Sequence, residues 1–128
     1  MRILVCGDRG WRSQERINQV LDAIHHITPI SLIIEGEARG ADIMSKNWAI
    51  SRGIPWKEYP ANWEKFGRAA GPIRNRQQFN EGKPDEVIAF HDDISQSKGT
   101  KDMVNYAQSK NCPVRIFTMK GAGDGDSI

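Results

Sequence analysis

The sequence has few of the features that mark a secreted, membrane-bound or metal-binding protein. It contains two cysteines, Cys6 and Cys112, near opposite ends of 128 residues, which is neither a disulfide framework nor the paired spacing of a zinc site. No apolar run approaches the length that spans a membrane. The apolar start over residues 1–6 is too short for a signal peptide. We therefore expect a reducing cytoplasm and no membrane partner.

Two nucleotide-binding signatures are also missing. The turn that begins at Gly7 and reads Gly-Asp-Arg ends the first apolar run, but it does not continue as G-x-G-x-x-G, which disfavours NAD. Residues 97–100, Ser-Lys-Gly-Thr, resemble only the end of a phosphate-binding loop, because the spacing G-x-x-x-x-G-K-[ST] is absent. We expect neither ATP hydrolysis nor a resident cofactor.

The charge pattern offers little to nucleic acid or to a metal. The net charge of +2 is far below that of a typical duplex binder, so we do not expect nucleic acid as a partner. The run His91-Asp92-Asp93 has ligand chemistry for a divalent cation. Consecutive side chains seldom converge on one ion, however, and the sequence offers no obvious further ligand. We predict no metal site.

The composition is that of a folded globular unit, with 38 % apolar and 27 % charged residues. The length suits one domain, which we place at residues 1–119, followed by a flexible tail at 120–128 rich in glycine and aspartate. Strand and helix patterns alternate along the chain. Strands are expected near 2–6, 31–35, 55–59, 87–90 and 114–117, and helices near 13–28, 41–52, 72–82 and 100–107.

This alternation predicts an α/β protein with a Rossmann-like three-layer sandwich. Right-handed crossovers and a start from the most apolar strand give a five-stranded parallel sheet of order 3-2-1-4-5. The ligand crevice then lies between strands 1 and 4, beyond their carboxyl ends. Polar loops at 7–12, 35–42, 60–72 and 91–99 are expected at that same edge, so the predicted site is composite.

The most informative stretch is 35–42, Glu-Gly-Glu-Ala-Arg-Gly-Ala-Asp, between a strand and a helix. Gly36 and Gly40 let the backbone approach a ligand closely. The helix that begins near Ala41 offers unpaired N–H groups and a positive dipole end. With Arg39 and Asp42, the stretch predicts a polar, anionic ligand such as a nucleotide phosphate.

Cations elsewhere allow two interpretations each. Arg9 can clamp a phosphate with two N–H groups, or it can simply be solvated in a turn. Arg74 and Arg76 fall in the first turn of a helix predicted to begin at Pro72, where each opposes the dipole by roughly 0.3–1 kcal/mol. Each therefore needs a partner, either a carboxylate of the protein or an anionic ligand.

Two further groups of residues also allow two interpretations each. The hydroxyl, ammonium and amide groups of 97–100 can meet a phosphate, or Ser97 and Thr100 can merely cap the helix. Trp63 and Phe66 can stack on a base, or they can cover the edge of the core or an oligomer contact.

Taken together, these motifs resemble one protein family. Gly7-x-Arg9, the 36–42 stretch, Ala61-x-Trp63, the run 67–75 and residues 97–100 are similar to the YspA-like branch of the SLOG superfamily, related to the LOG phosphoribohydrolases and DprA/Smf. The resemblance implies a phage or bacterial Rossmann-like protein that binds a nucleotide-derived ligand.

The resemblance to the LOG enzymes is incomplete. They cleave the N-glycosidic bond of nucleoside monophosphates with a PGGxGTxxE motif. Here Gly99-Thr100 matches the GT pair, Met103 replaces the glutamate, and Asp102 stands one residue short. A hydrolytic role does not carry over directly.

Our leading hypothesis is a homodimeric sensor or sequestering module for a nucleotide or ribosylated derivative. The alternative is an N-glycosidic hydrolase in which Glu37 or Asp102 stabilises an oxocarbenium-like centre. Single-stranded DNA binding is a third, weaker hypothesis. The residues predicted to bind the ligand are Gly7, Arg9, Gly36, Arg39, Gly40, Asp42, Trp63, Arg74, Asn75, Lys98, Gly99 and Thr100.

Overall fold

A five-stranded parallel sheet forms the centre of the protein, in a computed structural model that describes residues 1–119. The predicted tail at 120–128 lies outside the described residues. The strand order is β3-β2-β1-β4-β5, as the sequence predicts. The strands are β1 (Arg2–Gly7), β2 (Leu32–Glu35), β3 (Trp56–Glu58), β4 (Glu86–Phe90) and β5 (Val114–Phe117).

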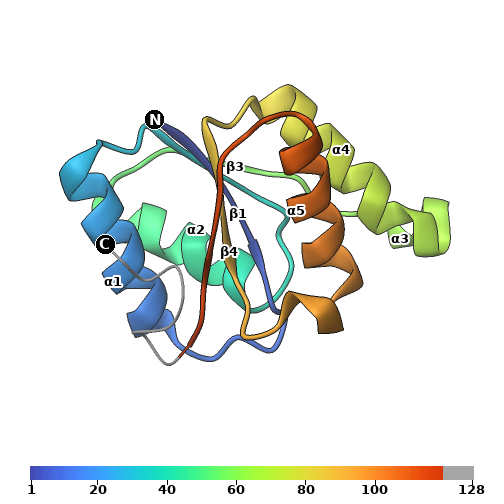
Figure 1. The fold of residues 1–128 in the computed structure, drawn as a ribbon, viewed down its shortest axis with the longest axis horizontal. Coiled ribbons are helices and arrows are strands. Elements are labelled where there is room, and N and C mark those ends of the chain that lie inside the picture. Colours follow the sequence, from blue (N-terminus) through green and yellow to red (C-terminus); the bar gives the residue numbers. More distant parts are fainter. Residues whose placement is uncertain (120–128) are drawn as a thin grey trace.

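Helices cover both faces of this sheet, which confirms the three-layer prediction. Figure 1 shows α1 (Gln14–Ile27) and α2 (Ala41–Arg52) on one face, and α4 (Ala70–Gly82) and α5 (Lys98–Ser109) on the other. Because β1 lies between two layers, Ile3, Leu4 and Val5 are all fully buried, and they divide between two apolar clusters.

Local end signals explain where α1 and α2 begin and end. The Ser13 hydroxyl accepts a hydrogen bond from the Arg16 N–H and caps α1. Gly53 ends α2 in the left-handed conformation, with φ of 69°. Both ends agree with the sequence prediction.

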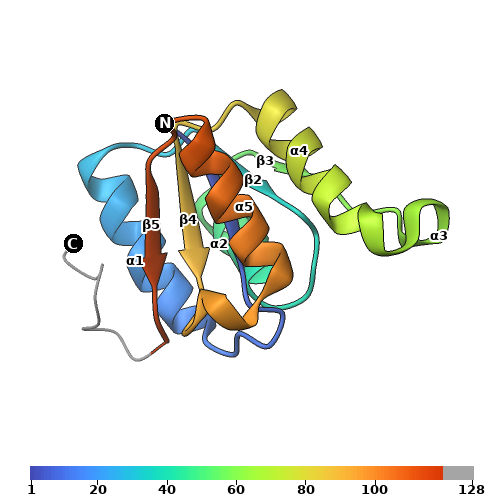
Figure 2. The same cartoon turned by 45° about the vertical axis from the view of Figure 1, so that its right-hand side comes forward.

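The segment predicted as a loop at 60–72 is instead largely helical, and this prediction was wrong. It contains α3 (Trp63–Phe66), capped by the Asn62 side chain, and a 3₁₀ turn η1 (Gly67–Ala69) that runs into α4. Helix α4 begins at Ala70, before Pro72, because proline is tolerated in a first turn whose N–H groups lack intrahelical acceptors. Figure 2 shows α3 projecting from the end of α4.

The earlier start of α4 changes the argument about two arginines. Arg74 and Arg76 lie past the first turn, so the predicted repulsion from the helix dipole does not act on them. Their partners are set by tertiary contacts instead. Among residues 1–119, no helix is long and apolar enough to cross a membrane.

Candidate functional site

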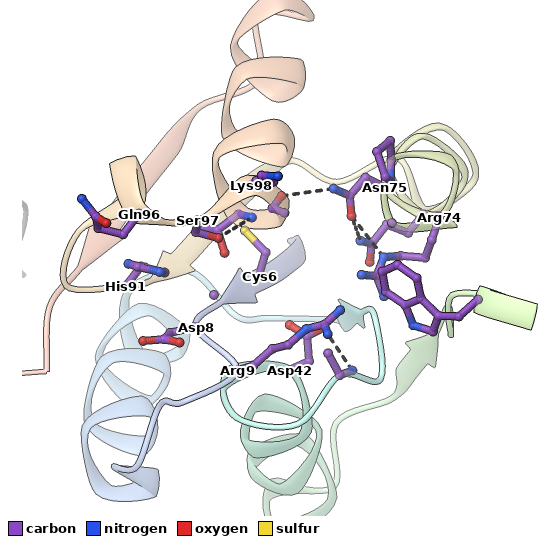
Figure 3. Close-up of a pocket in the computed structure, with 18 of the residues that line it drawn as sticks. Cys6, Asp8, Arg9, Asp42, Arg74, Asn75, His91, Gln96, Ser97 and Lys98 are labelled. Carbon is purple, nitrogen blue, oxygen red and sulfur yellow. Dashed lines mark hydrogen bonds between the residues drawn. The ribbon is translucent and has the colours of Figure 1, made fainter. Parts of the chain in front are cut away.

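A cavity of about 620 Å³ opens beyond the carboxyl ends of β1 and β4, where the sequence places the crevice. Strand β1 and its following loop, α2, α4 and the start of α5 all contribute side chains (Figure 3). Of the predicted ligand-binding residues, it is lined by Gly7, Arg9, Asp42, Trp63, Arg74, Asn75, Lys98, Gly99 and Thr100.

The 35–42 stretch is held against the loop after β1. The Ala41 N–H donates to the Asp8 carbonyl at 3.2 Å. Gly40 has a φ of 80°, and a Cβ at this position would lie 2.4 Å from that same carbonyl oxygen. Glycine is therefore required here by both conformation and space. The contact carries Asp42 into the cavity.

Arg74 crosses from α4 to the end of β2. Its Nη1 donates to the Gly36 carbonyl at 2.6 Å. A Cβ on Gly36 would lie 2.3 Å from that nitrogen and 2.9 Å from an Asp42 carboxylate oxygen. The missing side chain of Gly36 thus makes room for the guanidinium, which faces the cavity in Figure 3.

Asn75 joins α4 to α5. Its Nδ2 donates to the Gly99 carbonyl at 3.2 Å and to an Asp102 carboxylate oxygen at 3.0 Å. Its Oδ1 accepts from Arg74 Nε at 3.1 Å and from Gln78 Nε2 at 3.2 Å. An asparagine amide has two donors and two acceptor sites, so this one is fully occupied by the protein.

Asp102 is the partner of Arg76. Two hydrogen bonds of 2.9 and 3.0 Å join the guanidinium to the carboxylate, and the guanidinium also lies 4.1 Å from the centre of the Tyr106 ring. Burial alone would raise the pKa of Asp102, but hydrogen bonds from Arg76 and Asn75 outweigh it and hold the pKa below its ordinary value. Of the two partners predicted for Arg76, a protein carboxylate is the one present.

The cations that line the cavity differ from several other cations of the protein in having no carboxylate partner among residues 1–119. Arg76, Arg52, Arg115 and Lys46 pair with carboxylates. Within the described chain, none of the four cations lining the cavity has a carboxylate oxygen within 4 Å. They are Arg9, Arg68, Arg74 and Lys98. Their charge is available to an anion.

Two buried carboxyls lie beneath this positive rim. Burial raises the pKa of Asp42 to about 6, although Arg74 and the Ala38 N–H lower it. Burial also raises the pKa of Glu35 to about 8. The Glu37 N–H donates to Glu35 Oε1 at 2.7 Å, and Oε2 has no hydrogen-bond partner among residues 1–119. Asp42 lines the cavity, whereas Glu35 lies under the turn.

The start of α5 presents backbone amides to the cavity. The Ser97 hydroxyl accepts from the Thr100 N–H at 3.1 Å, so Ser97 is the cap that the sequence offered as one alternative. The amides of Lys98 and Gly99 are among those that a helix leaves without an intrahelical acceptor. A phosphate at this end of the cavity would meet both the amides and the dipole.

A second cavity of about 330 Å³ adjoins the first. It contains three of the predicted residues that the first cavity lacks, namely Gly36, Glu37 and Arg39, whereas Gly40 and Asp102 line neither. The two cavities share Arg9, Ala38, Trp63 and Arg74. The Arg9 guanidinium lies 5.2 Å from the centre of the Trp63 ring, so this stacked pair stands between them. The predicted site is thus divided in two.

Neither predicted catalytic carboxylate lines the larger cavity. Glu37, whose φ is 59°, forms a 2.9 Å ion pair with Lys46 on the side of the smaller cavity. Asp102 is engaged by Arg76 and Asn75 behind the α5 turn. The carboxyls that do line the larger cavity are Asp8 and Asp42.

Comparison of the sequence with known proteins identifies the family of this chain. The sequence model of the YspA, cpYpsA-related SLOG family (YAcAr) matches residues 1–66. The Gene 61 protein of Mycobacterium phage D29 is 30% identical over 122 residues, which cover 91% of this chain and 95% of the phage protein. This chain belongs to the YspA, cpYpsA-related SLOG family.

A solved structure supports the fold of this SLOG protein. DNA processing protein A (DprA) from Streptococcus pneumoniae superposes with a TM-score of 0.69 at 16% identity. The match covers 98% of this chain and 53% of the DprA chain, so the SLOG protein described here spans about half of that relative. At this identity the likeness shows the fold alone. The expectation that nucleic acid is not a partner gains no support from it.

Sequence reasoning missed several residues that line the SLOG cavity. Cys6 is the last buried residue of β1, and burial raises the pKa of its thiol. Gln78 lies one turn after Arg74 on α4, and this spacing was the signal that could have found it. Trp11, in the loop after β1, is only 2% exposed and packs against Phe90 as part of the core.

The loop after β4 has a structural role in the described chain. The Asp93 N–H donates to His91 Nδ1, and Asp93 in turn accepts from the Ser95 N–H. Asp92 accepts from the Met119 N–H. Among residues 1–119, no three His, Cys, Asp or Glu side chains are grouped so that they could hold a metal ion.

Proposed function

We propose that this SLOG protein binds a nucleotide through its phosphate in the larger cavity, as a sensor or sequestering module. The observation that carries the proposal is the set of four cations around one cavity that no carboxylate of residues 1–119 neutralises. Its volume lies in the usual range for small-molecule sites. Family membership supports a nucleotide-related ligand.

Different residues of the cavity bind the phosphate and the base. Arg74, held by Gly36 and Asn75, and the first amides of α5 hold the phosphate with little loss of side-chain freedom. Lys98 and Arg9, both exposed at the rim, add charge. The Trp63 ring, which is 47% exposed and lines the cavity, stacks on the base.

The hydrolase alternative now depends on Asp42. This carboxyl is 7% exposed, lines the cavity and has a pKa raised to about 6, which suits a general acid working near neutral pH. Glu37 and Asp102 are both committed to cationic partners. If the protein hydrolyses nucleotides, we therefore propose Asp42 as the acid.

Calorimetric titration with the four nucleoside 5′-monophosphates, and with the four nucleosides that lack the phosphate, tests the proposal. We expect at least one monophosphate to bind about tenfold or more tighter than its nucleoside. Lys98→Ala should weaken that binding by about fivefold to tenfold. Lys101→Ala removes the same charge from an exposed position of α5 outside the cavity and should leave the affinity within about twofold.

The proposal fails if no monophosphate binds, or if nucleosides bind as well as monophosphates. It also fails if Lys101→Ala and Lys98→Ala weaken binding equally, because the effect then comes from net charge alone. Chromatography of the same mixtures separates the two functions. Free base that disappears with Asp42→Asn indicates the hydrolase, and intact monophosphate indicates the binding module.

We also propose that the protein forms a homodimer, which would cover apolar side chains exposed on its surface. Phe66 and Ile73, on α3 and α4, are 39% and 42% exposed. Sedimentation velocity at several protein concentrations would measure the oligomeric state directly, and a single monomeric species would contradict the proposal.

A further inference from the structure

We infer that the two adjoining cavities together hold two nucleoside units joined by phosphate, one unit in each cavity. This inference rests on the proposed function, since it extends the phosphate site of the larger cavity. It goes beyond that function by naming the ligand class as a dinucleotide. The shared wall between the cavities is the observation from which it starts.

The wall is built from the groups that would hold a bridging phosphate. Arg9 and Arg74 line both cavities, and neither forms an ion pair with a carboxylate of the described residues. Arg74 is anchored by its hydrogen bonds to Gly36 and Asn75. Two cations between two cavities can bind a phosphate that links a nucleoside in one cavity to a nucleoside in the other.

The smaller cavity has the chemistry of a nucleoside site. Pro60 and Ala61 form an apolar wall on which a base can lie. Glu37 offers carboxylate oxygens that accept hydrogen bonds from ribose hydroxyls, and its position is fixed by the ion pair with Lys46. A volume of 330 Å³ is at the lower end for small-molecule sites, enough for one unit.

Arg39 distinguishes this cavity from the first. It lines only the smaller cavity, and it has no carboxylate within 4 Å among residues 1–119. A mononucleotide held by Arg74 and the α5 amides occupies the larger cavity. The Arg39 charge is therefore used fully only by a ligand that continues past the Arg9–Trp63 pair.

The test compares each nucleoside 5′-monophosphate with the 5′-phosphorylated homodinucleotide of the same base, by calorimetry on the full chain. We expect the dinucleotide to bind at least about tenfold tighter, because its second unit binds intramolecularly. Arg39→Ala should reduce this ratio of dissociation constants by about fivefold or more. Lys98→Ala should weaken both ligands in proportion and keep the ratio.

Arg12→Ala is the matched control, since Arg12 is an exposed arginine near the same edge and lines neither cavity. It should leave both dissociation constants within about twofold. The inference is overturned if the dinucleotide binds no tighter than the monophosphate, or if Arg12→Ala changes the ratio as much as Arg39→Ala. In either case the monophosphate still binds more tightly than its nucleoside, whereas failure of the proposed function removes that preference.

A 12-residue oligonucleotide of the same base tests whether the ligand ends at two nucleoside units. An affinity within about threefold of the dinucleotide supports two units and no more, whether free or at a strand end. An affinity tenfold higher, with a steeper salt dependence, overturns the inference, because the ligand then extends beyond both cavities.

Discussion

Glu35 offers a sharp test of the electrostatics beneath the site. Its side chain is fully buried, one carboxylate oxygen has no hydrogen-bond partner in the described part of the chain, and burial raises its pKa from 4.5 to about 8. The folded protein therefore binds this proton more tightly than the unfolded chain does. Glu35 contributes its full stability below about pH 4.5, and that contribution is lost as the pH rises towards 8.

The size of the effect follows from the two pKa values. Each unit of pKa is worth about 1.4 kcal/mol, and the interval from pH 6 to pH 8 lies between the unfolded and folded values of 4.5 and about 8. Ionisation of Glu35 should thus lower the free energy of unfolding by about 2 kcal/mol across this interval. Glu35→Gln has a similar shape and cannot ionise, so it should lack this loss.

Urea denaturation at pH 6, 7 and 8, followed by tryptophan fluorescence, measures the difference. We expect the free energy of unfolding of Glu35→Gln, relative to the original protein, to rise by about 2 kcal/mol from pH 6 to pH 8. Asp42 titrates in both proteins, so its contribution largely cancels in the difference between their free energies of unfolding. Glu64→Gln removes an exposed carboxylate on α3 and should show a flat difference. A flat difference for Glu35→Gln as well would refute the reasoning.

Two further predictions concern contacts that organise the site. Gly36→Ala places a Cβ 2.3 Å from Arg74 Nη1, so the guanidinium must move, and we expect a loss of about 1–3 kcal/mol in the free energy of unfolding. The exposed Gly10→Ala, whose Cβ meets only the movable Asp8 side chain at 3.3 Å, should stay within about 0.5 kcal/mol, and equal losses would contradict the argument. Asn75→Asp turns a donor towards the Asp102 carboxylate into an acceptor and should cost about 1–3 kcal/mol in urea denaturation. The added change Asp102→Asn should recover part of this loss, and no recovery would argue against the direct contact.

Much of the fold was predictable because its signals are local. The apolar run of β1, flanked by alternating strand and helix patterns, predicts the sheet and its order 3-2-1-4-5. The caps at Ser13 and Gly53 were predictable for the same reason, since each acts on its own neighbours. The start of α4 was not, because Asn62 and the 3₁₀ turn extend the helix into a polar segment whose pattern resembles a loop.

For the site, the sequence alone determined which residue types gather at one sheet edge, because parallel strands place all their following loops there. Only the tertiary structure decided how they are used. It pairs Arg76 with Asp102 and Glu37 with Lys46, leaves Arg9 and Lys98 without a carboxylate partner among residues 1–119, and divides the ligand residues between two cavities. Arg74 meets Gly36 across 38 positions of chain, and no local pattern records such a contact. Pairing of this kind depends on which helix packs beside which strand end, so it emerges only when the chain is folded.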